Sequence, residues 1–239
     1  MKRALAGLAL AATLAVAAAT TRPFWQAPDA AQAQAWLHDA ADRHDAGAEA
    51  ALARWSTRGN APARRAYAAL LAHRADATSR QALQQVLADG AAAGDAEAAT
   101  QLAELLSGAG ATHDDARIVR LLAQGSAGHV PAASRLLGLR ALDAHDLPRA
   151  ATLLAQAADG GDAPAMFLYA NLLRAGQGVP RDEARALALY ERAGDADYAP
   201  AIQALAIAWR YGELGLQADA SQSRLMDHEA AEALAYAAH

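Results

Sequence analysis

The feature that most constrains this chain is a short motif that returns about every 34 residues. Each copy is a glycine or aspartate followed by a polar residue, an alanine or valine, a proline or glutamate, and an alanine. The copies begin at Gly59, Gly94, Gly128, Gly161 and Asp197, in steps of 35, 34, 33 and 36 residues. This period is typical of a solenoid built from pairs of short helices. Strand signals are missing, because β-branched residues are few and never alternate.

The most regular copy spans residues 161–196 and predicts two helices joined by a glycine loop. The first apolar stripe has helical spacing and comprises Ala165, Leu168, Tyr169, Leu172 and Leu173. Gly176 and Gly178 should end this helix, because glycine readily takes positive φ. Asp182 should cap the second helix by accepting hydrogen bonds from its first N–H groups. The second stripe comprises Ala186, Leu189, Tyr190 and Ala193.

This unit resembles the Sel1-like repeat, a relative of the tetratricopeptide repeat. The matching residues are Ala165, Tyr169-Ala170, Gly176-x-Gly178-Val179-Pro180, Asp182-x-x-Arg185-Ala186, Leu189-Tyr190 and Arg192-Ala193. The resemblance implies an all-α fold, a right-handed α-solenoid of antiparallel helix pairs. One unit cannot bury its own apolar faces, so it requires neighbours.

The motif predicts how the chain is divided. We expect a signal peptide at 1–19, a flexible tether at 20–31, a divergent N-terminal helical cap at 32–58, and about five Sel1-like repeats over 59–239. The repeats are 59–93, 94–127, 128–160, 161–196 and 197–239. Second helices should be capped by Asp114, Asp146 and Asp182, and in the first repeat by Thr78 or Ser79. Gly108-x-Gly110 repeats the glycine loop. The repeat from 128 lacks this loop, so its chain must turn by another route between Leu142 and Asp146.

The first 19 residues predict export. Lys2 and Arg3 precede an uncharged apolar run, and Ala17-Ala18-Ala19 fits a signal-peptidase site. The run from 4 to 19 is short against the roughly 20 residues that span a bilayer, although an uncleaved anchor is the alternative. We expect a periplasmic or secreted protein with no integral membrane domain once the leader is removed.

Charge and cysteine content limit the classes of partner and chemistry that we expect. The formal charge is -5, and removing Lys2 and Arg3 leaves -7, which argues against nucleic acid because it attracts basic surfaces. The chain has no cysteine, which excludes disulfides and thiol chemistry. We expect no cofactor.

Several short motifs suggest chemistry but have simpler structural interpretations. His228-Glu229-Ala-Ala-Glu232 lacks the second histidine of a zinc-protease helix. His-Asp pairs occur at 38–39, 44–45, 113–114 and 145–146, where a metal or acid–base role competes with helix capping. The glycine loops follow helices rather than strands, unlike phosphate loops. With no catalytic triad evident, we expect no enzyme, no catalytic residue and no metal site.

A ladder of arginines is the best candidate for binding. Arg140, Arg174 and Arg210 stand near the ends of successive first helices, at steps of 34 and 36. One interpretation is that they stabilise the negative ends of helix dipoles, and the other is that they bind carboxylates of a partner. The resemblance places first helices on the concave face. The predicted partner-binding residues are Arg135, Arg140, Met166, Asn171, Arg174, Ile207 and Arg210, with Ile202 beside them.

These observations predict a non-catalytic exported adaptor that binds a protein or peptide of the cell envelope on its concave face. A scaffold in peptidoglycan or exopolysaccharide handling is the alternative. β-Lactam binding or hydrolysis, linked to cysteine-rich secreted relatives, is a weaker one because cysteine is absent. Aromatic residues make up only 5% of the chain, which favours protein over sugar.

Overall fold

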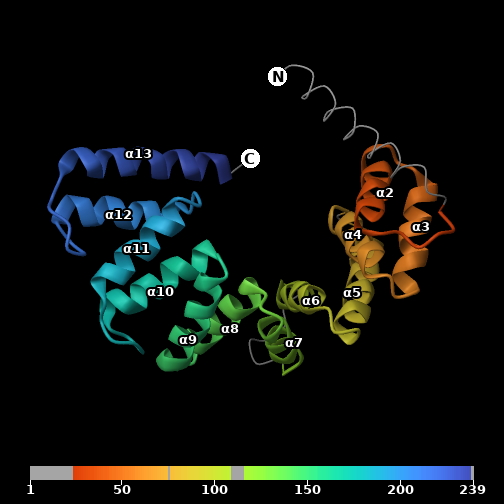
Figure 1. Cartoon of the computed structure of the whole chain (residues 1–239), viewed down its shortest axis with the longest axis horizontal. Coiled ribbons are helices and arrows are strands. Elements are labelled where there is room, and N and C mark those ends of the chain that lie inside the picture. The colour runs from red at the N-terminus through yellow and green to blue at the C-terminus, as the bar shows by residue number, and fades with distance from the viewer. Residues whose placement is uncertain (1–23, 75, 109–115, 238–239) are drawn as a thin grey trace, which may run out of the picture. The chain divides into compact units, whose positions relative to one another are not determined.

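The computed structural model describes residues 24–74, 76–108 and 116–237, and all regular structure in these ranges is α-helical (Figure 1). The helices of the first half are α2 (Ala30–Asp42), α3 (Ala46–Thr57), α4 (Ala61–Ala72), α5 (Ala77–Ala92) and α6 (Ala96–Gly108). Those of the second half are α7 (Ala116–Ala127), α8 (Pro131–Asp143), α9 (Leu147–Asp159), α10 (Ala163–Ala175), α11 (Glu183–Gly194), α12 (Ala199–Tyr211) and α13 (Ala220–Ala237). The predicted all-α class is confirmed. The chain forms two compact units, one ending at Leu105 and one beginning at Leu106.

Most helices begin at a side-chain cap, as the sequence indicates. The side chain of Asp182 accepts a hydrogen bond from the backbone N–H of Arg185, and that of Asp146 accepts one from Arg149. Each such cap stabilises a helix by about 0.5–2 kcal/mol. The expected cap at Thr78 or Ser79 is wrong, because Asp76 takes this place and α5 begins at Ala77. Hydrogen bonds from the side chain and backbone of Ser79 lower the pKa of the Asp76 carboxyl. Asp114 and Gly110 lie outside the described residues.

The helix pairs are joined by residues with positive φ that directly precede the next N-cap. Gly59, Gly94 and Gly161 hold this position, and so do His44, His129, His145 and Asp197. In the third repeat the residue is His129 rather than Gly128, so this first helix is shifted by one residue from the motif. Between Leu142 and Asp146, where the glycine loop is missing, the chain turns through the positive φ of His145. Gly176 and Gly178 have φ values of 67° and 71°, as predicted.

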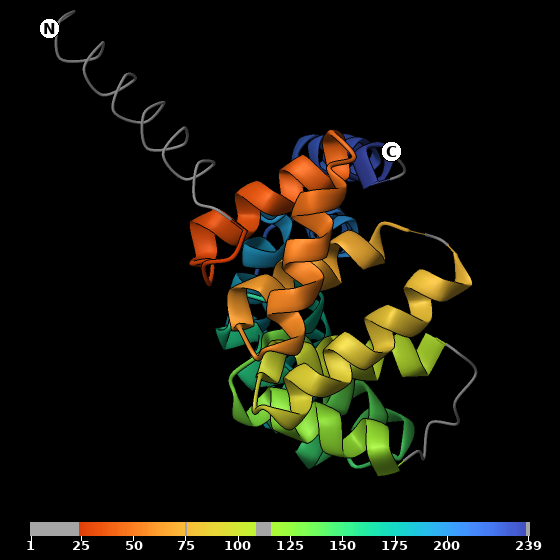
Figure 2. The ribbon, with the colours of Figure 1, turned by 90° about the vertical axis from the view of Figure 1, so that its right-hand side faces the viewer.

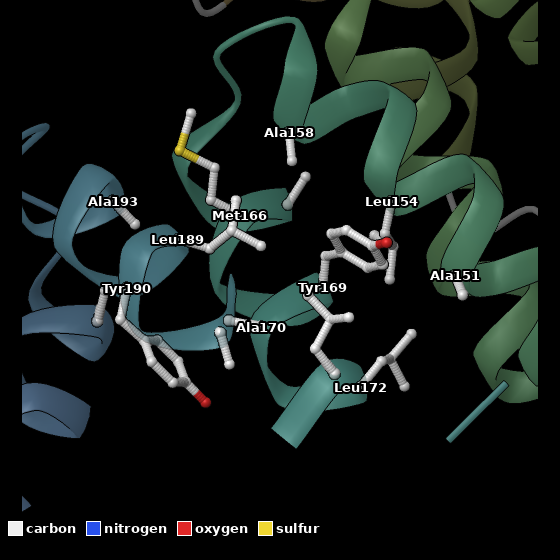
Figure 3. Close-up of a cluster of buried hydrophobic side chains, with 14 of the residues drawn as sticks. Ala151, Leu154, Ala158, Met166, Tyr169, Ala170, Leu172, Leu189, Tyr190 and Ala193 are labelled. Carbon is white, nitrogen blue, oxygen red and sulfur yellow. The ribbon is translucent and has the colours of Figure 1, made fainter. Parts of the chain in front are cut away.

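The core of the second unit lies between the paired helices. All members of the predicted second stripe are buried, and Tyr169, Leu172 and Leu173 of the first are buried with them. Figure 3 shows Tyr169 and Leu172 of α10 close to Leu154 of α9. Small residues bring the helices near each other. A Cβ on Gly138 of α8 would lie 2.8 Å from Cγ of Leu154 in α9.

The glycine loop after α10 touches the preceding helix pair. A Cβ added to Gly178 would lie 2.3 Å from both the carbonyl carbon and oxygen of Leu147, and 2.8 Å from the nitrogen of Pro148. Leu147 and Pro148 form the first turn of α9. The loop therefore requires glycine here for close backbone approach as well as for positive φ.

The first unit begins earlier than the sequence indicates (Figure 2, red to yellow). Residues 24–31 were expected to belong to a flexible tether, but Asp29 caps α2, which starts at Ala30. The rings of Phe24 and the buried Trp36 form a T-shaped pair with centroids 5.2 Å apart. The carbonyl oxygen of Phe24 accepts a hydrogen bond from Nε1 of Trp55 at 3.1 Å. This end of the tether is therefore part of the folded unit, whereas residues 20–23 lie outside the described residues.

An ion pair links α3 to the segment that follows α4 in the first unit. Arg74 donates two hydrogen bonds of 2.7 Å to the two carboxylate oxygens of Glu49 in α3. The hydrogen bonds from Arg74 hold the pKa of Glu49 below its usual value. Both side chains are about one-third exposed, at 38% and 32%, so solvent screens the pair.

Among the described residues, no helix is both long and apolar enough to cross a bilayer. The predicted signal peptide, residues 1–19, lies outside these residues.

Candidate functional site

The arginines of the ladder have the predicted positions, and two of them, Arg174 and Arg210, form ion pairs. Arg140, Arg174 and Arg210 all lie in the last turn of first helices. Nη1 of Arg174 lies 3.5 Å from Oε2 of Glu213, and both side chains are nearly half exposed. Nη2 of Arg210 lies 2.6 Å from Oδ2 of Asp227 in α13. Arg174 thus links two repeats and Arg210 links two helices, which favours a structural role for both.

Two other predicted residues bind neighbouring helices. Nε of Arg135 donates to Oδ2 of Asp162 at 3.0 Å, and this carboxylate also caps α10. The hydroxyl of Tyr190 donates to Oδ1 of Asn171 at 2.8 Å, joining α11 to α10. Burial raises the pKa of Tyr190. These contacts hold successive helices together.

The expectation that Met166 and Ile202 lie nearest a groove is wrong. Each is only 5% exposed and belongs to the core. The first helices α10 and α12 each pack against the helix before and the helix after them, so more than one stripe is buried. Ile207 is 44% exposed as expected, and Tyr211, one turn further on, is 67% exposed.

An open hollow of about 650 Å³ lies among α7, α8 and α9, and it contains Arg140. Arg120 of α7 and Arg149 of α9 line it too. Within the described part of the chain, neither of these side chains forms an ion pair or hydrogen bond. The remaining lining residues are Ala116, Val119, Leu137, Ala141, Asp143, Ala144 and Asp146. Three arginines against two aspartates leave one formal positive charge.

Arg120 and Arg149 were not predicted as binding residues, because they lie on second helices and the predicted ladder lies on first helices. Arg149 belongs to the motif Asp146-x-x-Arg149, which marks a helix start. The spacing of this motif could have indicated Arg149 as a lining residue. A residue three places after an N-cap lies in the first turn of the helix, beside the neighbouring helix. The hollow therefore combines one predicted arginine with two from second helices.

Histidines and acidic residues form no metal site in the described ranges, where no group of three or more such side chains comes together. Asp45 and Asp146 of two His-Asp pairs are helix caps, and His44 and His145 are the positive-φ residues before them. His38 pairs with Asp42 within α2. The pair at 113–114 lies outside the described residues. His228 faces Glu232 at 3.7 Å on a solvated surface, with both side chains about 70% exposed.

Comparison with known proteins identifies the fold. The family models searched and the curated proteins searched give no match to this chain. Among solved structures, a Sel1 repeat protein from Oxalobacter formigenes is similar with a TM-score of 0.73 and 19% identity, over 90% of this chain and 91% of that one. A protective antigen of uropathogenic Escherichia coli with an SLR fold is similar with a TM-score of 0.69 and 19% identity, over 84% of this chain.

This chain spans about half the length of the E. coli antigen, 48% of which is covered. The comparisons confirm that the chain has the Sel1-like fold, an α-solenoid of antiparallel helix pairs. At this level of identity the likeness concerns the fold.

Proposed function

We propose that the chain is a non-catalytic scaffold that binds a protein or peptide partner through an acidic segment. The observation that carries the proposal is the hollow lined by Arg120, Arg140 and Arg149. Arginine suits this role because its planar guanidinium donates paired hydrogen bonds to carboxylates. Val119 and Leu137 add apolar surface beside these donors, which an interface needs as well as charge.

Arg174 and Arg210 of the ladder are weaker candidates for binding this partner. Both already have carboxylate partners in Glu213 and Asp227. A partner would have to displace these acids, whereas Arg120 and Arg149 offer donors that no described carboxylate occupies.

Photo-crosslinking tests the proposal. A benzoylphenylalanine at Ala144, which is exposed and lines the hollow, should capture a partner in cells of the source organism. The same residue at Gln85, exposed on α5, is the control. Reversing charge with Arg120→Glu and Arg149→Glu should abolish the crosslink at position 144, and raised salt should weaken it. Arg174→Ala with Arg210→Ala should leave it intact.

The proposal is wrong if the charge reversal leaves the crosslink unchanged in a protein with an unaltered melting curve. A crosslink of equal strength from position 85 would show that the capture is not specific to the hollow.

We further propose that the chain works in the cell envelope. This rests on the leader sequence, with its basic start, apolar run and small-residue site. Mass spectrometry of the protein from its source should find a mature N-terminus near Thr20. An intact Met1 in the membrane fraction would establish an anchor instead.

A further inference from the structure

A groove of about 410 Å³ lies within the first unit, between α4, α5 and α6. Neither the residues of the hollow nor the arginines of the ladder line this groove. Apart from a few charged and amide groups, the groove is lined by Ala68, Ala69, Ala72, Leu83, Leu87, Ala98 and Leu105. Its volume falls in the range of about 300–1,000 Å³ typical of ligand pockets.

Arg64 of α4 lines this groove and is only 6% exposed. Its side chain forms no hydrogen bond or ion pair with any residue that the structure describes, and its Nε is buried without a partner. The side chain packs over Gly90 of α5, where an added Cβ would lie 3.2 Å from Cδ of Arg64. A guanidinium cannot lose its proton in a protein. Arg64 is therefore a largely buried cation with no described acid beside it, which is unfavourable unless an anion pairs with it.

The other charged groups of the groove already have partners. Nε of Arg65 lies 3.2 Å from Oδ2 of Asp95. The other oxygen of Asp95 accepts hydrogen bonds from backbone N–H groups at the start of α6. Glu97 is exposed and accepts a hydrogen bond from Gln101 at 3.3 Å. No acid of the groove is directed to Arg64, so the groove is complementary to one negative charge beside an apolar group.

We propose that this groove binds the C-terminal residue of a partner polypeptide, with an apolar side chain on the alanine and leucine floor and the carboxylate on Arg64. A C-terminal leucine or phenylalanine carries both groups on one carbon. An internal aspartate or glutamate would use its own side chain for Arg64 and leave the floor to a different residue. Arginine and carboxylate form paired, charge-assisted hydrogen bonds.

Fluorescence anisotropy of the purified protein tests this with a labelled peptide, Gly-Ser-Gly-Ser-Leu, as the free acid and as the amide. The acid should bind about tenfold more tightly, because it alone makes charge-assisted hydrogen bonds. Arg64→Met should remove the difference between acid and amide. Ala72→Trp, at an exposed part of the lining, should weaken both. Arg80→Met is the matched control, since Arg80 is exposed on α5 and does not line the groove.

Melting temperature provides a second readout. Arg64→Met should melt at or above the temperature of the unmodified protein, because it removes an unpaired buried charge. The acid peptide should raise the melting temperature of the unmodified protein but not that of Arg64→Met. A lower melting temperature for Arg64→Met would show that Arg64 has a structural partner and would overturn the proposal. Equal affinity for acid and amide would also overturn the proposal, and so would an absence of binding at millimolar peptide. A third contrary result would be tighter binding of decanoate than of N-acetyl-leucine, which would indicate that the groove binds a fatty acid.

Discussion

Replacing Gly178 by alanine tests whether the glycine loop holds one helix pair against the next. The new methyl group would lie 2.3 Å from the carbonyl carbon and oxygen of Leu147 and 2.8 Å from the nitrogen of Pro148. These are backbone atoms in the first turn of α9, so they cannot rotate aside as a side chain can. Either the loop or α9 must move.

The loss of stability in Gly178→Ala has two parts, one from backbone conformation and one from the close contact. Positive φ costs an alanine about 1–2 kcal/mol, and relieving an overpacked contact costs about 1–3 kcal/mol more. Gly178→Ala should therefore lower the free energy of unfolding by about 2–5 kcal/mol. Gly161→Ala is the matched control in the same unit. Its φ is also positive, at 90°, but no atom lies within 4 Å of the added Cβ, so only the first cost of about 1–2 kcal/mol applies.

Urea denaturation followed by far-UV circular dichroism measures both variants against the parent protein. Because repeats interact mainly with their neighbours, hydrogen exchange should also show that Gly178→Ala reduces protection at the start of α9. Equal midpoints for the two variants would refute the reasoning, since they would show that the loop does not need close contact with α9.

Three further predictions concern single residues. His145→Gly should raise the free energy of unfolding by about 0.5–1 kcal/mol, because it relieves positive φ at a non-glycine residue; His73→Gly, at a residue with ordinary φ, should lower it in the same thermal melt. Asp182→Ala should cost about 0.5–2 kcal/mol in a urea titration by removing the cap of α11, and no loss would mean that the cap is dispensable. Glu49→Gln should cost up to about 1 kcal/mol at neutral pH. Because the pair with Arg74 lowers the pKa of Glu49 from 4.5, this stabilisation is present above pH 4.5 and is lost as pH falls through the lower folded pKa. Melting curves from pH 7 to pH 3 should therefore converge for the two proteins; a constant gap would contradict an ionic origin.

The repeat pattern was readable from the sequence because it depends on local rules. A cap needs a short polar side chain next to an apolar stripe, and positive φ favours glycine, so Asp182, Gly176 and Gly178 could be assigned from their neighbours along the chain. His145 shows the limit of this rule. It takes a conformation that glycine usually takes, although histidine is also enriched there among other residues.

The candidate site was less readable because it depends on contacts between distant residues. Glu213 stands 39 residues after Arg174, and no local pattern joins them. A single stripe also underestimates burial in an internal repeat, which is why Met166 was placed on the surface. The unpaired state of Arg64 has no sequence signal at all, because it depends on which partners the neighbouring helices fail to supply.

The Asp-x-x-Arg motif shows how one repeat pattern supports different surfaces. In α9 and α11 the aspartate caps the helix, but the arginines have different environments. The guanidinium of Arg185 lies over the ring of Tyr169, 5.1 Å from its centroid, whereas Arg149 lines the hollow. Tyr169 stands eight residues after Gly161, and the residue eight after His129 is Leu137. Leucine offers no ring to a cation, so the neighbouring first helix determines whether the arginine of the motif serves packing or remains available to a partner.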